Sequence, residues 1–283
     1  MGLNLDAVGF RADPFTVTWT ERDAILYALG VGAGQADPLA ELSFTTENTS
    51  GVEQQVLPTF GIVLGQNGLL RRMPIGDYDK SKLLHGDQSI EVAGPIPPTG
   101  AASIQATVDG IYDKGSGALV VISAHASDRE TGRSLWTSRL GYFLRSEGGF
   151  GGVAAPGEAW QEPIGDPDLL VNAPTRADQG LLYRLNGDRN PLHSDPAFAG
   201  RAGFERPILH GLCTYGVVHR ALIGAICEGD VTTFESMYAR FSRPATPGAN
   251  LRTAVWRDDG GIRFRTTDDR GQVVLDRGRF DFR

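Results

Sequence analysis

The fold is decided by one stretch of sequence, Gly211-Leu-Cys-Thr-Tyr-Gly-Val-Val-His-Arg-Ala-Leu-Ile-Gly-Ala225. Its apolar side chains recur at helical spacing, which predicts a long helix with a mostly apolar face. Segments with the character of strands follow it at 236–243, 250–257, 262–267 and 273–282. We therefore expect an antiparallel sheet that curves around a central helix, which is the hot-dog arrangement.

Three pairs of segments recur in the same order along the chain, at 20–30 and 175–187, at 83–88 and 208–213, and at 128–144 and 269–280. The first pair predicts a short helix, capped by a Thr three residues before an Asp and ended by a Gly. In the second pair His85-Gly86 matches His210-Gly211, and we interpret both as the start of the apolar helix. The third pair predicts a turn that leads into a final strand.

These repeats predict a duplicated α+β domain, a tandem double hot-dog. The first hot-dog, residues 1–147, is expected to lack catalytic residues, because no His completes an acid/base pair after its first helix. Residues 148–160 are rich in Gly and Pro, which is typical of a linker. The second, catalytic hot-dog covers 161–283. We expect the two sheets to pair edge to edge, because pairing hides exposed strand edges.

Composition excludes several classes of protein. Of the 283 residues, 41% are hydrophobic and 22% are charged, and the net charge of −7 argues against nucleic acid as a partner. The sequence shows neither a signal peptide nor a membrane span. Cys213 and Cys227 would stand about 21 Å apart on one helix, too far for a disulfide. We expect a cytoplasmic protein with reduced cysteines.

The chemistry is concentrated in one run, Gly187-Asp188-Arg-Asn190-Pro-Leu-His193-Ser-Asp195-Pro196. Its prolines exclude a helix interior or a central strand, so we predict an ordered loop. Addition of water to a C=C bond conjugated to a thioester needs a base, an acid and a donor for the enolate oxygen. Asp188 and His193 are the natural acid/base pair, and Asn190 can hold the water. The backbone N–H of Gly211, at a helix start, is a suitable oxyanion donor.

The run from Tyr183 to Leu212 resembles the active-site signature of the MaoC-like dehydratase family, specifically its (R)-specific enoyl-CoA hydratases. The tandem arrangement resembles the hydratase unit of the peroxisomal multifunctional enzyme. The resemblance implies a lyase that hydrates acyl-CoA reversibly in fatty acid metabolism, without a cofactor or a metal, and a first hot-dog that supplies the tunnel for the acyl chain. We expect a homodimer, and the alternative is that the double hot-dog stands alone as a pseudo-dimer. It implies catalytic roles for Asp188, His193, Asn190 and Gly211, supported by Tyr183, Gly187, Asp195 and His210.

Each of these residues also has a simpler structural interpretation. Alone, Asp188 could cap a turn, His193 could be an ordinary surface histidine, and Asp195 could cap the next short helix. Together, His193, Asp195 and His210 could bind zinc, although their spacing matches no known ligand pattern. His85 lacks an accompanying Asp/His run, so we interpret it as structural.

Other functions remain open at this point. A hot-dog protein can be a thioesterase, or a binder of acyl thioesters without turnover, and the fold does not distinguish them. The substrate could also be carried on acyl carrier protein. Candidates for binding the phosphates of CoA are Arg206, Arg240 and Arg243.

Overall fold

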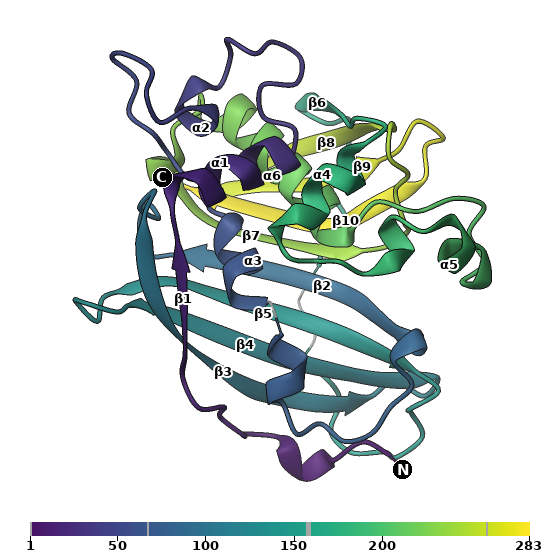
Figure 1. Cartoon of the computed structure of the whole chain (residues 1–283). Coiled ribbons are helices and arrows are strands. Elements are labelled where there is room, and N and C mark those ends of the chain that lie inside the picture. Colours follow the sequence, from purple (N-terminus) through teal and green to yellow (C-terminus); the bar gives the residue numbers. More distant parts are fainter. Residues whose placement is uncertain (1, 67, 157–159, 259) are drawn as a thin grey trace.

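Ten strands form one antiparallel sheet in the computed structural model, which describes residues 2–66, 68–156, 160–258 and 260–283 (Figure 1). The strand order is β1-β3-β4-β5-β2-β7-β10-β9-β8-β6. The strands before residue 148 are β1 (Phe15–Trp19), β2 (Leu83–Val92), β3 (Gly100–Asp113), β4 (Gly117–Asp128) and β5 (Ser134–Arg145). The later strands are β6 (Leu169–Pro174), β7 (Phe234–Phe241), β8 (Asn250–Asp258), β9 (Gly261–Thr267) and β10 (Val273–Phe282).

The two halves of the sheet meet where β2 pairs with β7, and we call this junction the seam. The pairing is antiparallel and runs from Asp87 opposite Arg240 to Glu91 opposite Ser236. The expectation that the two sheets pair edge to edge is therefore confirmed, and the arrangement is a double hot-dog. Residues that are far apart in the sequence become neighbours at the seam.

The long apolar helix of the second half is confirmed as α6 (Gly211–Ile226). Cys213, Tyr215, Val218 and Leu222 are fully buried along it, because the sheet β7–β10 curves around its apolar face (Figure 1). Cys213 and Cys227 are both free and buried. Among the described residues, no helix has the length and apolar character needed to cross a membrane.

The prediction that His85-Gly86 begins a helix is wrong, because this segment lies in β2. It pairs with β5 on one side, and the following residues pair with β7 on the other. Pairing on both edges satisfies the backbone of β2, so tertiary context decides between helix and strand here. The helix on this sheet is instead α3 (Phe60–Gln66), where Gly61 lets the helix approach Trp136 closely.

The other helices are short: α1 (Glu21–Gly30), α2 (Leu42–Thr45), α4 (Gln179–Tyr183) and α5 (Pro196–Arg201). Short 3-10 turns are η1 (Leu5–Ala7), η2 (Leu69–Arg72), η3 (Lys80–Lys82), η4 (Arg184–Asn186), η5 (Pro191–His193) and η6 (Val231–Thr233). The predicted cap forms before α1, where the Asp23 carboxylate accepts the Thr20 backbone N–H at 2.9 Å. The corresponding cap predicted for Thr175 before α4 does not form, because the Thr175 hydroxyl donates to the Ala249 carbonyl at 2.7 Å.

Part of the predicted linker, residues 157–159, lies outside the described residues. The described part of the linker up to residue 156 contains no helix or strand. The chain then enters β6, which forms the outer edge of the sheet.

Candidate active site

The predicted catalytic loop joins α4 to α6, and glycine makes its first turn possible. Gly187 follows η4 with φ of 120°, in the left-handed region that side chains disfavour. The turn is followed directly by Asp188. Asn190 then caps η5, because its side-chain oxygen accepts the Leu192 backbone N–H at 3.1 Å.

Asp188 is exposed and is held by a local backbone contact. One carboxylate oxygen accepts the Asn190 backbone N–H at 3.1 Å, which leaves further lone pairs for a ligand. This contact is the turn cap that the structural interpretation expects. It does not occupy the whole carboxylate, so capping and chemistry are compatible.

His193 is partly buried in η5, and its tautomer is fixed by one hydrogen bond. Nδ1 lies 2.9 Å from the Ile208 carbonyl oxygen, which can only accept, so Nδ1 carries the proton. Nε2 then presents a lone pair, as a general base needs. Burial lowers the pKa of His193 below its usual value, against opposing effects from the Ile208 hydrogen bond and the Asp188 charge.

His210 precedes the first residue of α6 and connects that helix to the loop. Its Nε2–H donates to the Asp188 backbone carbonyl at 3.2 Å, and its ring stacks on His193 with centroids 3.8 Å apart. Burial, and then the charge of His193, lower the pKa of His210 to about 4. His210 is therefore neutral at pH 7 and holds both members of the pair. Tyr183 packs behind it, with ring centroids 4.9 Å apart.

The three side chains converge on one point. One carboxylate oxygen of Asp188 and one ring nitrogen of each of His193 and His210 lie within 4.8 Å of one another. Two groups that hold one water by ordinary hydrogen bonds stand about 4.5 Å apart, so this spacing suits a bridging water. Stacked imidazoles direct their in-plane lone pairs side by side, an arrangement poorly suited to one shared metal ion.

Gly211 begins α6, so its backbone N–H has no acceptor within the helix and lies at the positive end of the helix dipole. A Cβ at this position would lie 3.3 Å from the Phe241 ring. The missing side chain therefore lets the Phe241 ring pack against the helix terminus, beside the backbone N–H to which a thioester oxygen could bind.

Asp195 does what its structural interpretation predicts. Its carboxylate accepts the backbone N–H groups of Ala197 and Phe198 at 2.8 and 3.3 Å, which caps α5. Among the described residues, the cluster of converging side chains contains Asp188 and not Asp195. Asp188 therefore stands where the zinc interpretation placed Asp195.

Sequence reasoning missed the contribution of the first half. The ring of His85 lies 4.8 Å from that of Phe241, which packs against Gly211 at the start of α6. Burial lowers the pKa of His85 to about 4, and the Asp188 charge opposes this shift; burial, and then the Asp188 charge, raise the pKa of Tyr142, a residue on β5. The structure therefore brings these two residues near the catalytic loop. No local signal could have indicated this, because their position depends on the pairing at the seam.

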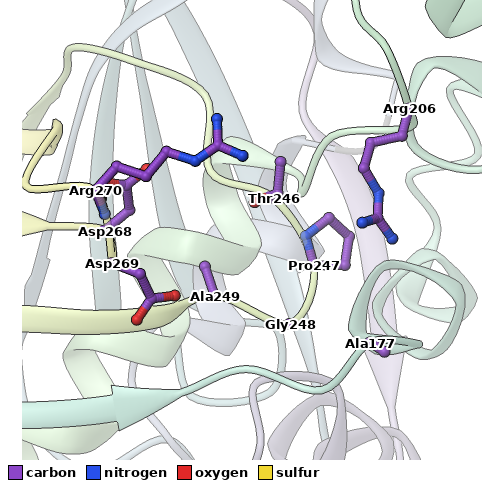
Figure 2. Close-up of a pocket in the computed structure, with 9 residues that line it drawn as sticks. All are labelled: Ala177, Arg206, Thr246, Pro247, Gly248, Ala249, Asp268, Asp269 and Arg270. Carbon is purple, nitrogen blue, oxygen red and sulfur yellow. Dashed lines mark hydrogen bonds between the residues drawn. The ribbon is translucent and has the colours of Figure 1, made fainter.

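A surface pocket of about 370 Å³ lies beside the loop (Figure 2). Arg206 and Arg270 line it from different segments, with Thr246–Gly248 between them in this view. Arg206 stands two residues before Ile208, whose carbonyl accepts from His193. Of the suggested phosphate ligands, Arg206 is thus in the pocket, whereas Arg240 faces Asp87 across the seam.

Comparison with known proteins places this geometry in a family. Residues 17–146 match the model of the MFE-2 hydratase 2 N-terminal domain, and residues 160–277 match the MaoC like domain. A 3-hydroxyacyl-thioester dehydratase of Mycobacterium tuberculosis is 42% identical, over 100% of this chain and 99% of that protein. An enoyl-CoA hydratase of the same bacterium is 43% identical, over 91% of each chain.

The crystal structure of a MaoC-like dehydratase from Phytophthora capsici superposes with a TM-score of 0.87 at 30% identity, covering 99% of this chain and 98% of that one. The similarity thus extends over both halves of the molecule and not just over the loop. The chain belongs to the MaoC-like dehydratase family.

Proposed function

We propose that the protein is an (R)-specific enoyl-CoA hydratase, a hydro-lyase that reversibly adds water to trans-2-enoyl thioesters in fatty acid metabolism. One observation carries the proposal. Asp188 and His193 converge at a spacing that suits one bridging water, beside the helix start at Gly211. The names of the relatives, enoyl-CoA hydratase and 3-hydroxyacyl-thioester dehydratase, agree with this chemistry.

The proposed reaction assigns a task to each group. The Asp188/His193 pair removes a proton from the bound water as its oxygen attacks C3 of the enoyl group. The electron pair of the C=C bond moves toward the thioester, and the Gly211 N–H stabilises the enolate oxygen. The pair then returns a proton to C2 on the same face, because both groups belong to one short loop.

His210 prepares this step without taking part in proton transfer. Its hydrogen bond fixes the Asp188 backbone, and its ring supports His193. Because its pKa is lowered to about 4, it does not place a second positive charge beside His193 at pH 7.

The proposed substrate carrier is CoA, and the alternative is acyl carrier protein. The pocket lined by Arg206, Arg270, Asp268 and Asp269 supports CoA through its two guanidinium groups, which can bind phosphates beside the loop. We further propose a homodimer, because Leu170 is exposed on β6 at the free edge of the sheet. A cytoplasmic location agrees with free, buried cysteines. We propose no metal or cofactor, since the pair supplies the required acid and base.

The test follows the enoyl-thioester absorbance with crotonyl-CoA and then identifies the product by chiral analysis. We expect the band to disappear and (3R)-hydroxybutyryl-CoA to form. Decenoyl-CoA and crotonyl-loaded acyl carrier protein serve as second substrates, which separate a chain-length or carrier preference from inactivity. Release of free CoA thiol from a saturated acyl-CoA, without hydration of any enoyl substrate, would instead establish a thioesterase.

A further inference from the structure

Three aromatic rings from three strands meet at the seam, and we call His85, Tyr142 and Phe241 the seam cluster. His85 on β2 is the cross-strand neighbour of Tyr142 on β5, with ring centroids 5.2 Å apart. The Phe241 ring, at the end of β7, lies 4.8 Å from that of His85. The first half thus supplies two rings and the second half one.

A bulge in β2 aims His85 toward this cluster. The register of β2 against β5 shifts between His85 and Asp87, which leaves Gly86 as the extra residue. Bulges of this kind redirect a side chain and are common beside active sites. The orientation of His85 is therefore built into the backbone of the strand.

The seam cluster faces the candidate active site. The Phe241 ring lies against Gly211, where an added Cβ would be 3.3 Å from it. Burial lowers the pKa of His85 and raises that of Tyr142, and the Asp188 charge also acts on both rings. His85 and Tyr142 of the first half thus extend the wall that Phe241 begins beside Gly211.

The Nε2 atom of His85 is buried and has no hydrogen-bond partner within the described parts of the chain. Burial lowers the pKa of His85 to about 4, against opposing effects from the neighbouring Gln88 side chain and Asp87 backbone, so the ring is neutral at pH 7. A neutral imidazole carries one proton, and because Nε2 has no partner we assign that proton to Nδ1. Nε2 is then a buried acceptor without a donor, which is costly unless a ligand supplies one.

The chemistry of the substrate indicates which donor fits. The enoyl chain has no N–H or O–H, and a thioester only accepts hydrogen bonds. The reacting water belongs to Asp188 and His193. The first donor beyond the sulfur is the amide N–H of the pantetheine arm, two methylene groups away. With the thioester at Gly211, this amide would lie past Phe241, on the side of His85.

We infer that His85 Nε2 accepts a hydrogen bond from the first pantetheine amide of the bound thioester, so that the non-catalytic half positions the substrate. The inference rests on the proposed function, because it takes the acyl thioester as ligand. It applies equally to CoA and to acyl carrier protein, since both present the same arm.

The test compares two crotonyl thioesters that differ in this amide. Crotonyl-S-N-acetylcysteamine has the amide, and the crotonyl thioester of butanethiol lacks it. His85→Phe keeps a ring of similar shape and removes the acceptor. We expect kcat/KM of this variant to fall about fivefold to tenfold with the first substrate, as for loss of one hydrogen bond, and less than twofold with the second.

Two further variants serve as controls. His85→Gln, whose amide oxygen can accept, should restore part of the preference for the amide substrate and covers the case in which the Phe variant does not fold. His125→Phe alters an exposed histidine on β4 and should change neither rate. An equal loss with both substrates, or no loss with either, would overturn the inference.

A failure of the proposed function is recognisable separately. If the wild-type protein hydrates neither thioester nor any longer enoyl-CoA, binding of butyryl-CoA is measured by calorimetry. Weaker binding to His85→Phe than to wild type would support the contact without catalysis. Equal affinities would reject it.

Discussion

The segments Leu84-His85-Gly86 and Leu209-His210-Gly211 have the same three residues and opposite structures. The first is a bulged part of β2, and the second starts α6. Even so, both histidines end at the candidate active site. His210 donates to the Asp188 backbone carbonyl, and His85 contacts the Phe241 ring that packs against Gly211.

The difference shows that a local sequence match does not fix the local structure. His210-Gly211 follows a loop and precedes an uninterrupted apolar helix, so the local pattern and the fold agree. His85 pairs with β5, and the residues after Gly86 pair with β5 and β7, so backbone pairing along β2 outweighs the helical pattern of this segment. The same residues then serve different tasks, because one begins a helix and the other lines a wall.

The largest expected effect is a loss of activity on replacing Asp188 in the catalytic loop, compared with Asp37 in the corresponding loop after α1. Asp188 and Asp37 make the same turn, each accepting the backbone N–H two residues ahead, at 3.1 and 2.9 Å. Asn preserves that turn and removes the charge. We expect Asp188→Asn to lower kcat/KM by roughly 10²–10⁴-fold, as for loss of a general acid or base. Asp37→Asn, the matched control, should leave activity unchanged, and near-normal activity of Asp188→Asn would reject the catalytic role.

A smaller effect is expected on adding a methyl group at Gly211 or at Gly86, and it should fall on activity in the first case and on stability in the second. In Gly211→Ala the new Cβ presses on the Phe241 side chain at 3.3 Å, and a ring at the substrate wall must move. We expect about a tenfold lower kcat/KM with little change in Tm, because small misplacements in a site are costly for catalysis. In Gly86→Ala the Cβ meets the Gly141 backbone oxygen at 3.2 Å. Strained strand backbone should cost about 1–3 kcal/mol of stability. Kinetics and urea unfolding of both variants measure the difference. A loss of stability in Gly211→Ala together with a loss of activity alone in Gly86→Ala would contradict this comparison.

The smallest effect concerns acid stability. Burial lowers the pKa of His85 to about 4, whereas an unfolded histidine titrates near the usual value of about 6.5. Below that value the unfolded chain binds more protons, so this stabilisation is complete above about pH 6.5 and is lost as the pH falls toward 4. His210 and His219, with pKa values of about 4 and 3, contribute in the same direction.

Replacing His85 isolates the contribution of the first half to this slope. We expect His85→Phe to lose less stability than wild type between pH 7 and pH 4.5, by at most about 1.4 kcal/mol per pH unit. Urea titrations at three pH values measure the difference. Parallel curves would show that His85 is not neutralised by burial, which would also weaken its role as a neutral acceptor.

Several features could be predicted from sequence because their causes are local. The apolar spacing of 211–225 determined α6, and segments of strand character with their turns indicated β5 and β7–β10. The prolines and glycines around Asp188 required a loop. The residue types in that loop indicated acid/base chemistry, although the tautomer of His193 needed the Ile208 carbonyl.

The tertiary structure alone decided what the first half contributes. The sequence by itself determined where a helix could bury its face and which loop holds an acid/base pair, since these depend on residues a few positions apart. The strand state of His85, its bulge and its place opposite Asp188 depend on β2 pairing with β5 and β7. Those partners lie about 50 and 150 positions away along the chain, and backbone pairing over such distances is invisible to local patterns.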